Sequence, residues 1–200
     1  MNDTPTKKQQ TRIRMLDAAS QGFRSRGYAG IGIDGIAKAA GVTSGAFYAH
    51  LGSKDEAFSA VLDAGLDEVI EAIPKMQNES GSEWVKAFAD YYMGRAHRKN
   101  LACGCAMTTL SPEVVRAAPE LRAAYESKMK IITNLLADGL KGGGREERLA
   151  RAWSFLSILT GGLTMARAVK TDKSAEKIAK SIRAAAMNVA GDTKQKSESK

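Results

Sequence analysis

Cysteine and proline are both scarce in this 200-residue sequence, and each scarcity excludes a class of protein. The only cysteines, Cys103 and Cys105, are separated by a single residue. That spacing is poor for a disulfide between them, and two cysteines are too few for the disulfide framework of a small secreted domain. Only four prolines occur. Together with frequent Ala, Leu, Lys, Arg and Glu, their scarcity favours helices over sheets.

Long apolar runs are absent as well. No stretch approaches the roughly 18 residues that a membrane span needs. Residues 1–10 carry charges but no apolar segment follows them, which is unlike a secretory signal. We therefore expect a cytoplasmic protein without a membrane partner. Neither a strand pattern nor an internal repeat is visible, so the sequence predicts an all-α fold.

Positive charge is concentrated in the first quarter of the chain. The net charge is +8, and residues 1–54, with eight basic and three acidic side chains, contribute +5 of it. A basic module attached to a near-neutral body suits a protein that binds a polyanion. A merely solubilising surface is the alternative interpretation.

Apolar residues recur at helical spacing along most of the chain. In the first helix, from Thr11 to a C-terminal Gly27, the predicted buried face comprises Ile13, Leu16, Ala19 and Phe23. Pro74 is expected to stop a long helix from Lys54 to Ile73, and Ser111-Pro112 to start a new turn. The remaining patterns predict helices over 34–40, 43–50, 82–97, 121–140, 149–163 and 178–189. The expected organisation is a flexible basic arm at 1–10, a domain of short helices at 11–56, a helical body at 57–190 and a flexible tail at 191–200.

The segment from Ile36 to His50 has the features of a helix-turn-helix. Ala37 is small where two helices would touch, and Gly41 can adopt the positive φ of the turn. Val42 provides an apolar side chain after the turn, and Thr43 or Ser44 can cap the second helix. Small and polar residues at the start of that helix let the backbone approach the major groove of DNA.

These residues, with others around them, strongly resemble the tetracycline-repressor (TetR) family of regulators over roughly residues 12–60. Two departures are visible: Leu51 stands where the family usually has Phe, and Gly32 where it usually has a Thr or Ser cap. The matching positions are Phe23, Gly27, Tyr28, Ile36, Ala37, Gly41, Val42, Gly45, Phe47, Tyr48, His50, Ser53, Lys54 and Phe58.

The resemblance implies a dimeric repressor of palindromic double-stranded operator DNA. It places Thr43, Ser44, Gly45 and Ala46 at the groove-facing start of the recognition helix. Tyr48 and His50 are implied as phosphate or base contacts and Lys54 as a phosphate contact. Packing of Tyr48, and a role for His50 as a cation at a helix C-terminus, remain alternatives. The basic arm with Lys7, Lys8 and Arg12 reaches the DNA or is simply solvated.

For the body, the resemblance implies that the last two long helices form a four-helix bundle with a second subunit. Gly161, Gly162 and Ala166 lie beside the apolar stripe of one of these helices and permit close approach, although an intrachain core is the alternative. A small-molecule inducer of unknown identity is expected in a pocket of the body, and no cofactor is expected. Candidate linings, each of which can equally be core, are Trp84, Phe88, Tyr91, Tyr92, Met107, Tyr125, Met129 and Trp153.

The run Cys103-Gly104-Cys105 resembles a branch of the family with Gly-Cys at this place. Some family members sense electrophiles or oxidants through cysteine, and a thiolate at a helix N-terminus is reactive because its pKa is lowered. Cys105, with Cys103 as a resolving thiol, is thus a candidate sensor, and a small buried residue is the alternative. With His97, the cysteines make a poor metal site because a fourth ligand is missing, so we expect no metal.

Two other classes of protein fit the sequence less well. An enzyme would depend on a Cys105–His97 nucleophile–base pair, but nothing in the sequence positions a third group. We therefore expect no catalytic residue. A non-specific architectural DNA-binding protein would bind bulk duplex as well as it binds a short palindrome.

Overall fold

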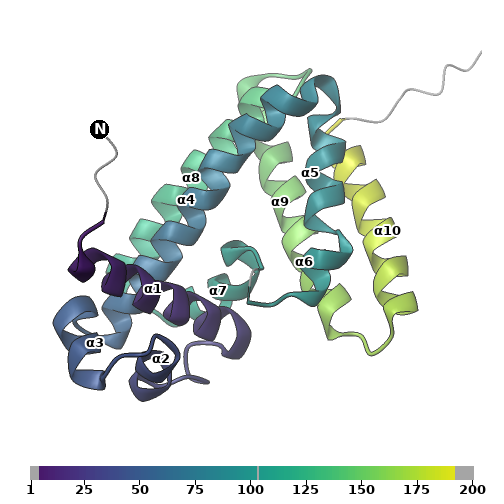
Figure 1. The fold of residues 1–200 in the computed structure, drawn as a ribbon. Helices are drawn as coiled ribbons and strands as arrows, with labels where there is room; N and C mark the ends of the chain where they lie inside the picture. The colour runs from purple at the N-terminus through teal and green to yellow at the C-terminus, as the bar shows by residue number, and fades with distance from the viewer. Residues whose placement is uncertain (1–4, 103, 192–200) are drawn as a thin grey trace, which may run out of the picture. The chain divides into compact units, whose positions relative to one another are not determined.

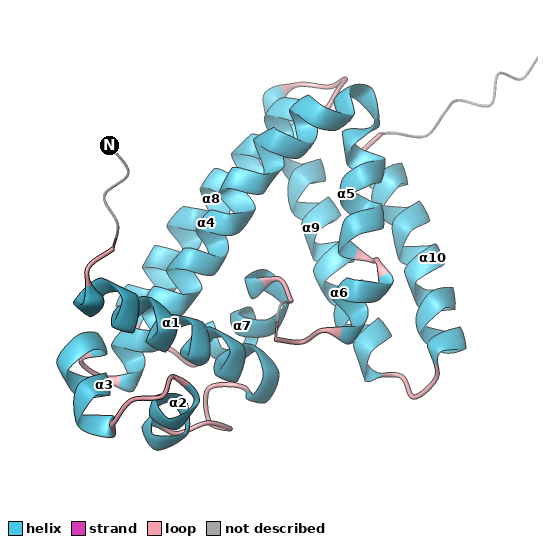
Figure 2. Ribbon diagram, in the orientation of Figure 1, coloured by secondary structure: helices cyan, strands magenta, loops and turns pink. Residues whose placement is uncertain are grey.

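The computed structural model describes residues 5–102 and 104–191, and within these ranges the chain forms only helices and the turns between them (Figures 1 and 2). This confirms the all-α prediction. The helices are α1 Lys7–Arg26, α2 Ile33–Ala39, α3 Ser44–Leu51, α4 Lys54–Ser80, η1 Gly81–Glu83, α5 Trp84–Tyr92, α6 Arg95–Lys99, α7 Ala106–Val114, α8 Pro119–Gly139, α9 Arg145–Ala168 and α10 Asp172–Val189.

The chain divides into two compact units. Unit 1 comprises residues 1–67 and 100–126, and unit 2 comprises 68–99 and 127–200. Unit 1 thus contains α1, α2, α3, α7 and the first parts of α4 and α8. Unit 2 contains the rest of α4 and α8 together with α5, α6, α9 and α10.

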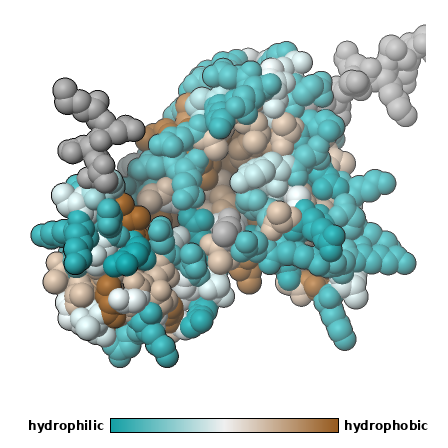
Figure 3. Space-filling model, viewed as in Figure 1, coloured by the Kyte–Doolittle hydropathy of each residue, from teal (hydrophilic) through white to brown (hydrophobic). Residues whose placement is uncertain are grey.

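In unit 1, α2 packs against both α1 and α3, and α7 packs against α1. Phe23 and Phe47 are fully buried and form the centre of its core with the edge-on ring of Phe58, whose centroid lies 5.3 Å from that of Phe23. Figure 3 shows hydrophilic side chains over most of the viewed face, with hydrophobic ones scattered among them. Most large apolar side chains of the described residues are buried.

The start and the buried face of the first helix differ from the prediction. Helix α1 begins at Lys7, inside the predicted flexible arm, because Thr6 and Gln9 form a capping box that satisfies free N–H groups at its start. Met15 is buried, whereas Ile13 is 50% exposed. Two positions along a helix rotate a side chain by about 200°, so only one of the two can face the core.

Neither proline lies at the boundary that the sequence predicted, a helix end at Pro74 and the start of a turn at Pro112. Pro74 lies inside α4, which continues to Ser80, and Pro112 lies inside α7. A proline within a helix costs about 3 kcal/mol. Packing offsets this cost because Ile73 is fully buried beside Pro74, and Leu110 and Val114 are buried around Pro112.

The predicted helix over 82–97 is interrupted after Tyr92. The amide N–H of Gly94 bonds to the carbonyl of Tyr91 at 3.1 Å, and the chain then turns into the short α6. The guanidinium of Arg98 donates to the Met93 carbonyl at 2.7 Å, so the open end of α5 is satisfied by a side chain from the next helix.

Unit 2 is built on the pairing of α9 and α10, which lie side by side (Figure 1). A Cβ added at Gly162 of α9 would lie 2.5 Å from Ile182 of α10, so the two helices approach at this glycine. Within the same unit, Gln77 of α4 donates to the Leu135 carbonyl of α8 at 2.9 Å. Trp84 and Phe88 of α5 pack on Phe155 of α9.

Candidate nucleic-acid interface

The turn between α2 and α3 has the geometry that the sequence predicted. Gly41 has φ +67°, which is accessible to glycine and strained for other residues. Thr43 is the residue that caps α3, because its hydroxyl accepts from the Ala46 amide at 3.2 Å. The fully buried Phe47 anchors α3 to the core. The start of α3 is therefore held rigidly at the surface of unit 1.

The residues predicted to face the DNA groove lie on the surface of α3. Thr43 and Gly45 are exposed, Ser44 and Ala46 are half-buried, and Tyr48 is 56% exposed. The nearest atom to a Cβ added at Gly45 would be the Thr43 hydroxyl at 3.8 Å, so no neighbouring helix requires this glycine. Close approach to a neighbouring helix of the described chain therefore does not explain Gly45, and close approach to DNA remains a prediction.

Two side-chain contacts that the sequence did not predict hold α3 in place. The Ser44 hydroxyl donates to the Asp34 carboxylate of α2. Arg12 of α1 donates to the carbonyl of His50, in the last turn of α3. Arg12 therefore belongs to a helix and caps another one, and it is not part of a flexible arm. Ser44 and Asp34 are ten residues apart, a separation that belongs to no local sequence motif, so the sequence did not predict their hydrogen bond.

Lys54 lies at the first position of α4, after a capping box between Ser53 and Glu56. Its Nζ lies 4.2 Å from the centroid of the Tyr28 ring, in a cation–π contact. The Tyr28 hydroxyl donates to the Asp55 carboxylate. Burial, and then this hydrogen bond, raise the pKa of Tyr28 to about 12. The Lys54 ammonium is thus a positioned charge near the surface.

Cys105 is the residue before the first turn of α7, as the sequence predicted, and it is half-buried. Arg24 of α1 donates to the neighbouring Gly104 carbonyl at 2.8 Å. Ala106 is buried against α4. A Cβ added at Gly65 of α4 would lie only 2.7 Å from the Cβ of Ala106, so the two helices approach closely at this glycine. The predicted body at 57–190 thus includes a helix that packs within the unit of the helix-turn-helix. Cys103 lies outside the described residues.

A second contact joins this segment to α1. The carboxylate of Glu113 in α7 accepts from the backbone N–H of Tyr28 at 3.2 Å, just beyond the end of α1. Met107, one of the candidate pocket residues, is buried in unit 1, as is Leu110. Tyr125 is half-buried, and its hydroxyl lies 2.7 Å from that of Ser111.

The other candidate pocket residues divide by exposure in unit 2. Trp84, Phe88, Tyr92 and Met129 are buried, whereas Tyr91 is 60% and Trp153 44% exposed. Two pockets of the described chain, one in each unit, are lined by none of the eight candidates. Their role as ligand contacts stays a prediction.

His97 of α6 is also part of this aromatic region. Its ring stacks on Tyr92, with centroids 5.4 Å apart, and its pKa is lowered by burial and by the charge of Arg167. Among the described residues no cluster of three or more metal-ligating side chains occurs. No helix in the described ranges has the length and apolar character needed to cross a bilayer.

Two family models match the chain. The model described as "Bacterial regulatory proteins, tetR family" matches residues 15–61. The model described as "Transcriptional regulator LmrA/YxaF-like, C-terminal domain" matches residues 82–181, half of the chain. Together they cover the helix-turn-helix and most of unit 2.

Individual relatives agree with these models. The chain is 41% identical to the regulator TtgR of Pseudomonas putida over 61 residues, which are 30% of this chain and 29% of TtgR, so less than a third of that relative is matched. It is 24% identical to the repressor NemR of Escherichia coli over 136 residues, 66% of this chain and 68% of NemR.

Solved structures share the fold. The reduced form of E. coli NemR superposes with a TM-score of 0.74 at 20% identity, covering 90% of this chain and 97% of NemR. A TetR regulator from Legionella pneumophila superposes with a TM-score of 0.76 at 20% identity, covering 94% and 98% of the two chains. The family and these relatives are transcriptional regulators and not enzymes. With both parts of the chain matched, the protein belongs to the TetR family of bacterial transcriptional regulators.

Proposed function

We propose that this protein is a dimeric repressor that binds a palindromic operator through α3 in the cytoplasm and is released by a small-molecule or reactive inducer. The observation that carries the DNA-binding part is the start of α3, which is capped, anchored by Phe47 and open to solvent at Gly45. Of the relatives that the chain resembles, NemR is named as a repressor.

In this proposal, Thr43, Ser44, Gly45 and Ala46 approach base edges, because small residues let the backbone enter the major groove. Tyr48 and His50 contact phosphate or bases, and Lys54 contacts phosphate. The hydrogen bond from Ser44 to Asp34 leaves the serine oxygen able to accept one from DNA. DNA binding is assigned to residues 11–56, with the body at 57–190 sensing and dimerising.

Dimerisation is supported by an unpartnered face on α9. Trp153 is 44% and Met165 61% exposed; Met165 lies four residues after Gly161 and Trp153 eight residues before it. A Cβ added at Gly161 would meet no atom of the described residues within 4 Å. Gly162 and Ala166, by contrast, are buried within the chain. The small residues thus have two roles, and the outer face of α9 remains for a second subunit. A two-fold dimer presents its recognition helices about 34–36 Å apart on DNA.

The inducer is proposed to bind in the body, within unit 2, among Trp84, Phe88, Tyr92 and Met129. The second route is covalent. Modification of Cys105 would alter the start of α7, where Gly104 is bonded to α1 and Ala106 is buried. Overpacking there costs roughly 1–3 kcal/mol, which matches a typical allosteric coupling energy.

The test of DNA binding is Gly45→Val. The substitution meets open space, so the dimer should stay folded while the branched side chain keeps the backbone from the groove. Gel-shift titration with an operator selected from random duplexes should show loss of specific binding. Gly144→Val is the matched control, since Gly144 is also a glycine with no atom within 4 Å of an added Cβ. Full operator binding by the Gly45 variant would refute the placement of α3.

The test of the covalent route compares wild type with Cys105→Ser. The DNA-bound protein is treated with a small electrophile or a mild oxidant, and operator release is followed by fluorescence anisotropy. If only the wild-type protein leaves the operator, Cys105 is supported as the sensor. A Cys103→Ser variant then shows whether Cys103 takes part as a resolving thiol. Equal release of both proteins, or release of neither, makes Cys105 a packing residue and favours a reversible inducer.

A further inference from the structure

Unit 2 contains a charged pocket that none of the residues discussed for DNA or inducer binding lines. It lies where α6, the C-terminal end of α9 and the first turns of α10 meet, and its volume is about 480 Å³. We call it the α6–α10 pocket. Small-molecule sites commonly have volumes of about 300–1,000 Å³. The charged residues that line it are the cations Arg95, Arg98, Lys99, Arg167 and Lys173 and the carboxylates Asp172 and Glu176.

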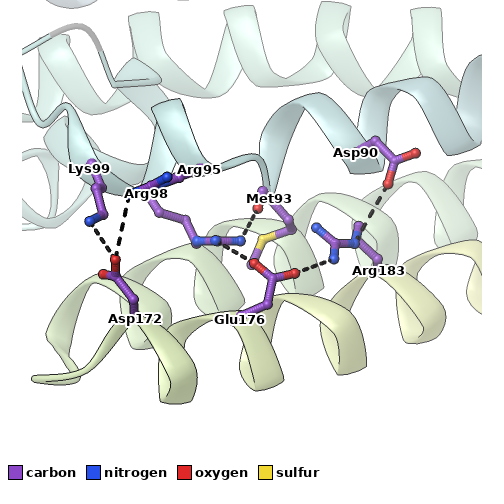
Figure 4. A network of polar contacts seen from close by, with 8 residues as sticks. All are labelled: Asp90, Met93, Arg95, Arg98, Lys99, Asp172, Glu176 and Arg183. Atoms are coloured by element: carbon purple, nitrogen blue, oxygen red, sulfur yellow. Dashed lines mark hydrogen bonds and ion pairs between the residues drawn. The ribbon is translucent and has the colours of Figure 1, made fainter.

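Ion pairs organise the cations of this pocket (Figure 4). Lys99 Nζ lies 2.7 Å from the Asp172 carboxylate, which Arg95 approaches to 3.9 Å. The Arg98 side chain is only 9% exposed and bonds to Glu176 at 2.6 Å. Arg98 also donates to the Met93 carbonyl, so its guanidinium is fixed from two sides. The hydrogen bond from Lys99 lowers the pKa of Asp172. The hydrogen bonds from Arg183 and Arg98 lower the pKa of Glu176.

These two carboxylates do not balance the positive charge. The lining carries an excess of three positive charges. In addition, Glu176 is shared with Arg183 of α10, whose guanidinium lies 2.9 Å from it. The pocket also includes Thr171 and Asp172 at the N-terminus of the 18-residue α10, where helix amides add partial positive charge. Anions are therefore attracted to this pocket.

The remaining wall of the pocket is apolar. Ala166, Val169 and Ala175 line it and leave room beside the charged side chains. Arginine and lysine beside an apolar wall suit a ligand with an acidic group on a small apolar body, because the guanidinium fork can bind two oxygens of a carboxylate or phosphate.

We propose that the α6–α10 pocket binds a small organic anion. Its acidic group is held by Arg95 and Lys99, in competition with the Asp172 carboxylate, and its apolar part covers Ala166 and Val169. The site does not depend on DNA binding or on the inducer pocket proposed above.

The experiment measures binding of three aromatic probes to the full chain by calorimetry at low salt. Phenyl phosphate and phthalate carry a phosphate and two carboxylates, and benzamide is neutral. We expect saturable binding of at least one anion, with one site per chain, and no binding of benzamide. The stronger of the two anions identifies the acidic group.

Two variants test the site in opposite directions. Arg95→Gln/Lys99→Gln should weaken the anion about tenfold, the effect of losing charged hydrogen bonds. Asp172→Asn removes the internal competitor and should tighten it, also about tenfold. Lys86→Gln is the matched control, because Lys86 is about as exposed as Lys99 and is ion-paired to Asp90 at 2.8 Å outside the pocket. It should leave the affinity unchanged.

Loss of folding cannot imitate this result, because a misfolded Asp172→Asn protein would not bind more tightly. No binding of either anion up to about 10 mM overturns the proposal. Unchanged or weaker binding by Asp172→Asn also overturns it, and so does an equal loss in the Lys86 control.

Discussion

The proposed phosphate contact of Lys54 gives a quantitative prediction for Lys54→Ala. The Lys54 ammonium is held 4.2 Å from the Tyr28 ring centroid at the start of α4. Removing it loses a cation–π contact worth about 0.5–1 kcal/mol at an exposed site, so the free energy of unfolding should fall only slightly. The larger effect should appear in DNA binding, where each protomer loses one charge.

The expected change follows from counterion release. Each lost phosphate contact lowers the slope of log K against log salt by about 0.9, hence about 1.8 for a symmetric dimer. A fourfold rise in salt should therefore change the ratio of wild-type to variant affinity by about 12-fold. Fluorescence anisotropy with a selected operator, between roughly 50 and 200 mM salt, measures this ratio.

Two variants isolate the charge at this position. Lys54→Arg keeps the charge and should keep the slope. Lys75→Ala removes an exposed lysine further along α4, 3.9 Å from Glu79, and should not change it. An unchanged slope in Lys54→Ala would refute the phosphate contact and leave Lys54 with its local role over Tyr28.

Two further predictions concern the dimer and the aromatic cluster. Trp153→Glu places a charge on the outer face of α9 and should shift the sedimentation coefficient from that of a dimer to that of a monomer. The control Val115→Glu, at a 75% exposed residue of unit 1, should leave the dimer intact. If the Trp153 variant stays dimeric, the interface lies elsewhere. The raised pKa of Tyr28 stabilises the fold fully below pH 10, the ordinary pKa of tyrosine, and this contribution is lost as the pH rises towards about 12. Ultraviolet titration should show this late ionisation in wild type but not in Tyr28→Phe, and its persistence in the variant would contradict the assignment.

The sequence was sufficient where local chemistry decides structure. Gly41 at a positive φ, Thr43 as a cap and the Ser53–Glu56 box depend on residues at most three positions apart, so their spacing predicts their geometry. The helix-turn-helix was predictable because its signals are all of this kind. The helix start at Cys105 was found in the same way.

Proline shows where local rules fail. Pro74 and Pro112 were expected to end or begin helices, yet both lie within one. The local cost of a proline is fixed, but burial of Ile73 and Leu110 depends on helices distant in the sequence. Likewise, only the fold shows that Ile13 faces solvent and Met15 the core.

By itself, the sequence determined the all-helical class, the helix-turn-helix and the family resemblance, because these depend on periodicity and short-range spacing. Only the tertiary structure decided that α7 packs in the unit of the helix-turn-helix and that Gly161 faces outward while Gly162 meets Ile182. It alone brought Arg95 and Lys99 together with Asp172, more than 70 residues away along the chain. Contacts at such separations depend on how helices pack, and packing is a property of the whole chain that no local pattern records.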